Sequence, residues 1–400
     1  MRILAAIWAA AVALGPDTAT AQETSAPSEA ETPLSPTLSR IIAAGPAFIY
    51  DEDEAAGSGY ARRNVFYNSD GTFAFVFEND AIAGTDRNYT NGFRASYMGA
   101  PRLRRFRPYD VANTVSDAGV GPVTLDNAID IIPTRDKIET PRERVYVRRG
   151  FHFGQSIFTP RDIERAVPDR EDRPYAGWLY GGVTYVVERR RNERVVLDTF
   201  QANLGMVGPS AFGDEVQNQF HRWIGDDPAN GWDFQLDNEP GLELLYERRI
   251  QLWTSPRLGP VQASFEPHVG GALGNVTING RFGGTVRIGD RLDLDYGPAR
   301  VRPALAGANF FLPDPDGFNW YVFLGADVRG VGRNLFLDGN TFDNDSPSVD
   351  KRTFVFDAQT GLAVQTGRLQ TALTLVYRSK EFMDQLSPDR FGAITVEVAL

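Results

Sequence analysis

The sequence predicts an all-β protein, a twelve-stranded antiparallel transmembrane β-barrel with a short helix in an extracellular loop. Twelve segments alternate with period two, and most are near or above the roughly nine to eleven residues that a tilted strand needs to cross a bilayer. One face of these segments is aromatic or aliphatic, whereas the other mixes Gly, Ser, Thr, Gln, Arg and Glu. A soluble sandwich would have shorter strands and an apolar interior. Because exported strands can span lipid only as a closed barrel, we expect a polar lumen and a lipid-facing exterior.

The N-terminus has the features of an export signal. A charged start is followed by an apolar run over residues 3–15 and by the small-x-small triplet Ala-Thr-Ala at 19–21. The run is shorter than the about 20 apolar residues that a membrane-spanning helix needs. We therefore predict a cleaved signal peptide over residues 1–21. Residues 22–68, rich in Ala, Pro, Ser, Thr and Glu, are predicted to form a flexible periplasmic leader.

The barrel is predicted to occupy residues 69–400. Its clearest alternation sets Phe73, Phe75 and Phe77 against smaller or polar neighbours. The chain also ends on an alternating segment, as bacterial barrels do, although its last residue is Leu400 rather than an aromatic residue. The predicted strands cover roughly residues 73–78, 92–97, 145–158, 176–188, 194–207, 240–253, 260–275, 280–289, 318–332, 352–365, 369–380 and 391–400.

Composition narrows the classes of function. The chain has 41 basic and 52 acidic residues, a net charge of −11, which argues against general nucleic-acid binding. It has no cysteine, which excludes disulfides, thiolate catalysis and zinc–thiolate sites. Residues 101–144 hold many Arg, Pro and Asp residues without alternation, and we predict a periplasmic insertion there. We expect a monomer in the bacterial outer membrane, in contact with outer-membrane lipids.

The segment 208–227 carries one of only three histidines in the chain. Its apolar residues recur at i, i+4, i+7 and i+8 from Val216, which predicts a short amphipathic helix. Gln217 and His221 are one helical turn apart beside that stripe, so both can face a neighbouring wall. A neutral imidazole there can act as a general base near neutral pH. The alternative is a half-buried histidine with a structural role.

Antiparallel threading determines which loops meet. With the N-terminus in the periplasm, the first strand ends outward at Asn79 and Asp80, and the His221 helix forms the third outer loop. Polar groups from three loops are therefore predicted to gather at one outer rim. The alternation points four polar side chains of the neighbouring strands inward: Thr90, Arg94, His152 and Ser156.

Four stretches in the first half of the barrel carry a family resemblance. They are Phe77–Asp80, Asp86–Gly92, Tyr175–Gly177 and, above all, the run from Gly208-Pro209 through Glu215-Val216-Gln217-Asn218 to His221-Arg222. On these stretches, within about residues 71–240, the chain resembles the outer-membrane lipid A deacylases of the LpxR type. The resemblance implies a barrel enzyme that removes the 3′-linked acyloxyacyl chain from lipid A with calcium.

The resemblance also implies which residues act. The family has an Asn-Asp pair at the end of the first strand, Thr or Ser on the next strand, a histidine in the helix and a carboxylate six residues further on. These positions hold Asn79, Asp80, Thr90, His221 and Asp227. The last is Glu in the family, and the neighbouring Asp226 leaves the assignment open by one position. Asn79 and Asp80 offer the oxygen ligands that Ca²⁺ prefers, so the resemblance implies that they bind it.

One family residue has no counterpart. The family uses a lysine in the second extracellular loop, but this chain has no lysine between Lys137 and Lys351. The role is vacant or is taken by an arginine of that loop. Arginine matches phosphate oxygens with two parallel hydrogen bonds, so we expect Arg161 and Arg173 to bind the phosphates of the substrate.

The expected function is calcium-dependent ester hydrolysis of lipid A by direct water attack. His221 is the expected base, and Asp227 or Glu215 is expected to orient its imidazole. Two alternatives stay open. One is a passive or structural barrel with a degenerate site. The other is an outer-membrane phospholipase that would use Ser156 beside His152.

Overall fold

The computed structural model describes five stretches of the chain, residues 71–80, 88–104, 144–191, 194–297 and 310–400. The chain divides into the units Met1–Gly59 and Tyr60–Leu400, and all five stretches belong to the second. The predicted signal peptide (1–21) and leader (22–68) lie outside the described residues. Of the predicted insertion 101–144, only its two ends are described.

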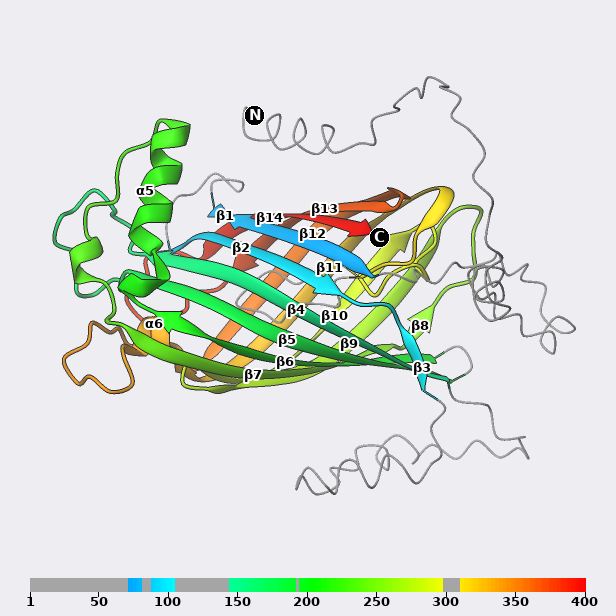
Figure 1. Cartoon of the computed structure of the whole chain (residues 1–400), viewed down its shortest axis with the longest axis horizontal. Helices are drawn as coiled ribbons and strands as arrows, with labels where there is room; N and C mark the ends of the chain where they lie inside the picture. The colour runs from blue at the N-terminus through cyan, green and yellow to red at the C-terminus, as the bar shows by residue number, and fades with distance from the viewer. Residues whose placement is uncertain (1–70, 81–87, 105–143, 192–193, 298–309) are drawn as a thin grey trace, which may run out of the picture. The chain divides into compact units, whose positions relative to one another are not determined.

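The described strands form one antiparallel sheet that closes into a barrel (Figure 1). The sheet has fourteen strands, of which β3 (Arg102–Arg104) and β8 (Trp253–Thr254) are short extensions paired to β4 and β9. The remaining twelve form the wall and confirm the predicted number. They are β1 (Thr72–Asn79), β2 (Asn88–Met98), β4 (Arg144–Thr159), β5 (Ala176–Arg191), β6 (Arg194–Val207), β7 (Glu239–Gln251), β9 (Gln262–Gly274), β10 (Thr277–Gly289), β11 (Asp314–Asn334), β12 (Phe354–Gly367), β13 (Leu369–Arg378) and β14 (Asp389–Ala399).

The first and last strands of the wall close the ring. β1 pairs with β14 over its whole length, from Thr72 opposite Ala399 to Asn79 opposite Gly392. β10 pairs with both β9 and β11, so the described wall has no free edge. In a bilayer each unpaired backbone group would cost several kcal/mol, which is why only a closed sheet is stable there.

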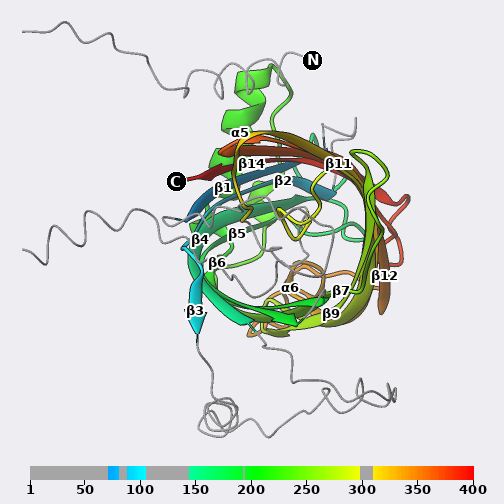
Figure 2. The ribbon, with the colours of Figure 1, turned by 90° about the vertical axis from the view of Figure 1, so that its right-hand side faces the viewer.

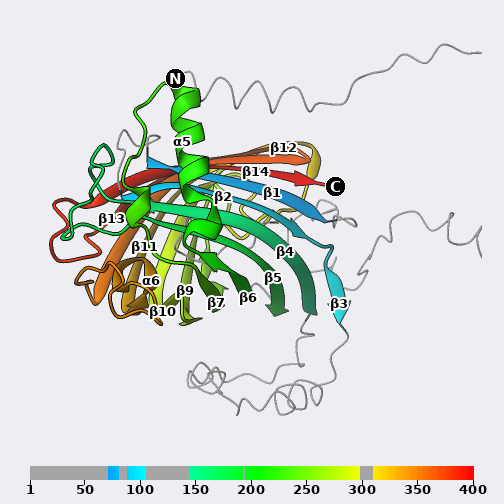
Figure 3. The same ribbon diagram turned by 60° about the vertical axis from the view of Figure 1, so that its left-hand side comes forward.

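The helices lie at one end of the barrel. The connection from β6 to β7 contains η3 (Pro209–Ala211), α5 (Gly213–Ile224) and η4 (Trp232–Phe234), and α5 confirms the predicted helix of the third loop. α6 (Leu335–Asp338) follows β11 at the same end, as Figures 1 and 3 show. No helix of the described part is long and apolar enough to cross a membrane.

Side chains alternate between lipid and lumen as the sequence predicts. On β1, Phe73 and Phe75 are exposed on the outer face, while Ala74 and Val76 are buried inside. Three of the four side chains predicted to point inward, Arg94, His152 and Ser156, are buried, which agrees with that prediction. The fourth, Thr90, lies on β2, and its side chain is outside the described part.

Apolar side chains pack both ends of the lumen. At the α5 end, Phe336 of α6 stacks on Phe158 of β4 with ring centroids 4.2 Å apart, and Trp178 belongs to the same buried cluster. At the opposite end, the described parts of the connection between β10 and β11, residues 290–297 and 310–313, fold into the ring of strands (Figure 2). Phe310 lies 3.9 Å beneath the guanidinium of Arg148.

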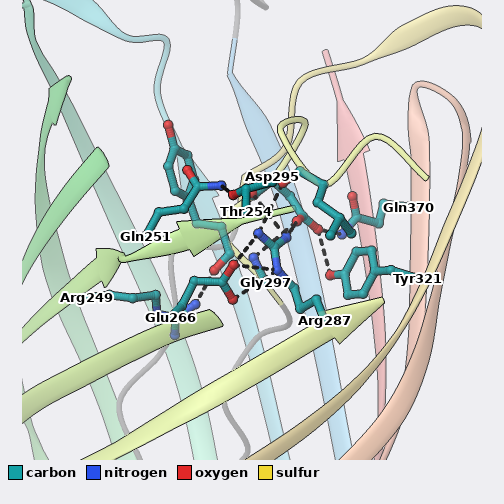
Figure 4. A network of polar contacts seen from close by, with 11 residues as sticks. Arg249, Gln251, Thr254, Glu266, Arg287, Asp295, Gly297, Tyr321 and Gln370 are labelled. Atoms are coloured by element: carbon teal, nitrogen blue, oxygen red, sulfur yellow. Dashed lines mark hydrogen bonds and ion pairs between the residues drawn. The ribbon is translucent and has the colours of Figure 1, made fainter. Parts of the chain in front are cut away.

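A buried polar network holds that segment in place (Figure 4). Arg287 of β10 donates to both oxygens of Glu266 and, at 2.5 Å, to the Asp295 carboxylate. Asp295 also accepts hydrogen bonds from the Tyr321 hydroxyl at 2.6 Å and from the Gln370 amide at 2.9 Å. Removing one partner from such a buried pair typically costs about 3–5 kcal/mol because a charge stays uncompensated. The network therefore fixes a packed lumen rather than an open channel.

Candidate active site

On the outer face of the barrel wall, side chains change from exposed to buried near the end that carries α5. Along the outward row of β4, the exposed fraction is 60% for Phe151 and 48% for Phe153, but 3% for Gln155 and 1% for Ile157. The first two residues face outward without protein cover, whereas the last two are covered by the loop that contains α5. A covered zone on the outside of the wall therefore lies at the rim.

Glycine lets the loop lie directly on the wall. Gly177 of β5 pairs with Ile157, and its carbonyl accepts a hydrogen bond from the Gly208 amide at 3.0 Å. A Cβ on Gly177 would lie 2.9 Å from the Ala211 Cβ, closer than packed atoms tolerate. The Gln155 amide donates to the Ala211 carbonyl at 2.5 Å. These contacts place the beginning of α5 against the outer face of β4 and β5.

A cluster of aromatic residues supports this anchor. Tyr175, which precedes β5, packs against Trp232 with ring centroids 4.9 Å apart. Its hydroxyl donates to the Ile163 carbonyl at 3.3 Å. Burial raises the pKa of Tyr175 to about 12, so the hydroxyl stays protonated and keeps donating at neutral pH. The Tyr175–Gly177 stretch therefore acts as a support for the loop.

α5 turns a polar face to the wall. Gln217 and His221 are 1% and 3% exposed, as expected for two residues that face a neighbouring wall. The Trp232 indole donates to the Gln217 side-chain oxygen at 3.1 Å. The apolar stripe predicted from the sequence is covered less well, because Phe220 is only half-buried and Trp223 is 67% exposed.

The end of β1 at the rim contacts the same helix. Asn79 belongs to the outward row of β1, yet it is only 4% exposed, and its cross-strand partner Asn91 is buried as well. Phe77, two residues before Asn79, contacts Phe220 of α5 with ring centroids 6.2 Å apart. This contact places the turn of α5 that contains Phe220 and His221 near the end of β1, next to the buried Asn79 and Asp80.

We call this arrangement the seam. It is the covered polar strip between the wall and α5, and its members are Asn79, Asn91, Gln155, Gln217 and His221. Sequence reasoning did not single out Asn91 and Gln155 as parts of a site. The signal that could have found them is a polar residue in an outward row, where lipid would otherwise be the neighbour.

The main chain determines the tautomer of His221. Its Nδ1 lies 2.5 Å from the carbonyl oxygen of Asp227. A carbonyl can only accept, so in the neutral imidazole Nδ1 carries the proton and Nε2 keeps its lone pair, the form that a base requires. The carboxylates of Asp227 and Glu215 are exposed. From the sequence we expected the Asp227 carboxylate to orient the His221 imidazole, but the backbone carbonyl of Asp227 makes that contact.

The two arginines predicted to bind phosphate lie in different surroundings. Arg161 is exposed, and its backbone amide donates to Asp172 at 2.8 Å. Arg173 is buried, with its guanidinium 3.5 Å from Glu381 and 5.2 Å from the centre of the Phe158 ring. It therefore points into the mouth of the lumen and not into the seam.

Thr90 lies where the β2–β4 register shifts between Tyr89 and Asn91.

Two hollows flank this region. An enclosed cavity of about 30 Å³ lies in the lumen, lined by Arg173, Lys351 and Glu381 among others, and has room for only a few water molecules. An open groove of about 890 Å³ runs beside α5 and is lined by Phe220 and Trp223 together with polar residues. The groove borders the helix that carries His221, but the residues that line it include no member of the seam.

The donor chemistry at the β1 rim fits a hard cation. Asn79 and Asp80 are adjacent and both buried, and they supply an amide and a carboxylate oxygen. Within the described part of the chain, no group of three or more His, Asp and Glu side chains could hold a metal ion. A calcium site there would therefore be completed by carbonyl, amide or water oxygens, which Ca²⁺ accepts in a six- to eight-fold shell.

Known proteins resemble this chain in sequence pattern and fold. A family model described as "Outer membrane protein LpxR" matches residues 43–400. LpxR from Salmonella typhimurium has a similar structure, with a TM-score of 0.61 and 20% identity over 82% of this chain and 100% of that chain. The β domain of the Bordetella autotransporter Brka has a TM-score of 0.40 at 8% identity, over 83% of this chain and 100% of that chain. No curated protein matches the sequence significantly.

The close approach at Gly177 gives a first prediction. Gly177→Val should push η3 and α5 off the wall, because overpacking costs about 1–3 kcal/mol and should raise local opening at least about five-fold. We expect faster trypsin cleavage at the exposed Arg222 while the barrel keeps its heat-modifiable gel mobility. Gly181→Val is the matched control, since a Cβ there would meet only the His152 carbonyl oxygen, at 3.8 Å. Equal cleavage of the two variants would contradict the packing of the loop on β5.

Proposed function

The chain belongs to the LpxR family of outer membrane proteins, and we propose that it hydrolyses the 3′-linked acyloxyacyl ester of lipid A. The observation that carries the proposal is the seam. It places a histidine and amides on the outside of a membrane barrel, where the ester of a lipid in the outer leaflet can reach them. A site inside the packed lumen would be separated from such a lipid by the barrel wall.

His221 is the proposed general base. With Nδ1 donating to the Asp227 carbonyl, Nε2 can take a proton from the water that attacks the acyl carbon. The water oxygen then bonds to that carbon, the ester C–O bond breaks, and the proton returns to the departing alkoxide of the lipid. The products are a fatty acid and a deacylated lipid A. The role of Asp227 in this scheme is to fix the tautomer through its backbone.

Calcium is the proposed cofactor, held by Asn79 and Asp80. When bound, it supplies a positive charge that stabilises the oxyanion formed during attack. Thr90, which lies at the register shift between β2 and β4, is proposed to hold the water or a ligand by a hydrogen bond.

The two alternative functions find less support. A passive pore needs an open lumen, whereas this lumen holds apolar clusters and the Arg287 network. A serine-dependent phospholipase needs Ser156 next to His152, but four residues along a strand separate them by about 13 Å. His152 is also engaged with Asn203 at 2.7 Å and Thr184 at 3.2 Å. We therefore retain a single proposed function.

Replacement of the histidine tests the proposal. Cells expressing the chain should release lipid A lacking the 3′-linked acyloxyacyl chain, and His221→Ala should reduce that product by about 10²–10⁴-fold while the barrel still folds. Mass spectrometry of extracted lipid A measures it. The lumenal His152→Gln variant is the control and should retain most of the activity. Loss in His152→Gln with retention in His221→Ala would move the site into the lumen, and intact lipid A in every strain would favour a degenerate barrel.

Removal of the metal tests the cofactor. A calcium chelator should abolish deacylation, and re-added Ca²⁺ should restore it. Asp80→Asn should raise the Ca²⁺ concentration required at least about 10-fold, the lower end of what even outer-shell partners of metal ligands contribute. Glu171→Gln, which removes an exposed charge from the second loop, should leave the calcium requirement unchanged. Full activity in the presence of chelator would exclude the metal.

Only the exposed arginine is proposed to contact substrate phosphate. Arg161→Ala should slow hydrolysis of phosphorylated lipid A about 10-fold more than that of a dephosphorylated analogue, since a hydrogen bond to a charged group contributes about 1.5–3 kcal/mol. Arg165→Ala on the same loop is the control, because that guanidinium already pairs with Asp169 at 3.5 Å. Equal rate losses on both substrates would refute phosphate binding by Arg161.

A further inference from the structure

α5 has three faces, and one of them lies uncovered beyond the wall. At 3.6 residues per turn, the buried face carries Gln217 and His221, the adjoining face carries Phe220 and Trp223, and the opposite face is polar. In Figure 1 the helix lies across the direction of the strands, and in Figure 2 it extends beyond their ring. Trp223, on the last turn but 67% exposed, has no described protein neighbour that buries it.

The uncovered face continues the lipid-facing surface of the barrel. Phe73 and Phe75 form the exposed outer row of β1, and Phe77 is the next member of that row. Phe77 contacts Phe220 at 6.2 Å between ring centroids, and Phe220 contacts Trp223 at 6.1 Å. A continuous aromatic row therefore leads from the wall onto the helix.

The direction of this face follows from the same contacts. Phe77 lies two residues further from the rim than Asn79, toward the middle of the wall. Because Phe220 rests on Phe77, the apolar face of α5 is directed toward the middle of the membrane. Gln219 and Arg222, which hydrogen-bond to each other at 2.8 Å, are exposed on the polar side. This order of faces is the one that helices lying in a membrane interface have.

We propose that α5 is an interfacial membrane helix whose Phe220 and Trp223 lie among the acyl chains of outer-leaflet lipids. Tryptophan is enriched at this depth because its ring is apolar and its N–H is polar. The arrangement fixes the depth of His221 at the boundary between acyl chains and headgroups. If the seam hydrolyses lipid A as proposed, α5 presents the base at the depth where acyl esters lie, without lifting the lipid out of the membrane.

Fluorescence quenching tests the proposal without relying on activity. The folded protein is reconstituted in phosphatidylcholine vesicles whose acyl chains carry bromine, and the emission of Trp223→Phe is subtracted from that of the wild type. The subtraction isolates Trp223, since the exposed Trp253 and the buried tryptophans contribute equally to both. We expect the difference signal to be quenched by brominated chains and protected from aqueous iodide. Quenching by iodide, or by neither agent, would overturn the insertion.

A matched pair of charge variants tests the consequence for the seam. Trp223→Glu and Arg222→Gln each lower the charge of the helix by one, on its apolar and its polar face. Trp223→Glu should lower the hydrolysis of vesicle-bound lipid A about tenfold or more, as loss of burial of one large apolar side chain predicts, and Arg222→Gln should not. Equal rates would refute the role of the apolar face in positioning His221. An inactive wild type would refute the proposed hydrolysis and leave the quenching result to decide the insertion.

Discussion

The closure of the hydrogen-bonded sheet between β1 and β14 is the constraint on which the rest of the structure depends. Lipid offers no partners for backbone groups, so all twelve strands must pair in one ring. Once the ring is closed with antiparallel neighbours, the ends of β1, β4, β6 and β11 lie at the same rim. The rim therefore gathers segments that are far apart in the sequence, including Asp80, His221 and α6.

In a closed barrel the outward positions of the membrane-spanning part face lipid, and the seam differs because protein covers its outward positions. Asn79, Asn91 and Gln155 occupy outward positions where an uncovered amide would face lipid. The third loop removes that cost: Gln155 donates to the Ala211 carbonyl of η3, and α5 adds the buried side chains of Gln217 and His221. The polar residues of the rim therefore need the loop that contains α5 to cover them from lipid. A site on the outer wall is accessible to a molecule that itself lies in the membrane.

The sequence predicted local features well and tertiary ones less well. Period two identified all twelve wall strands, and helical spacing placed Gln217 and His221 on one buried face, because both patterns depend on near neighbours in the chain. The side of the wall on which the seam lies was not predicted, since it depends on how the third loop folds back over β4 and β5. For the same reason the burial of Arg173 and the backbone contact of Asp227 were not foreseen.

The outer face of the wall carries the seam, whereas the lumen carries contacts that stabilise the barrel. The residues of the seam belong to strand ends and to a helix, which hold side chains in place better than loops do. The Gly177 carbonyl and the Gln155 side chain hydrogen-bond to the segment that leads into α5. In the lumen, the Arg287 network joins β9, β10, β11 and β13, and the Phe336–Phe158 stack packs α6 against β4. Substitutions in the lumen therefore act through the stability of the barrel. Under the proposed function, substitutions in the seam change the hydrolysis while the barrel stays folded, so the two kinds of variant can be told apart in one experiment.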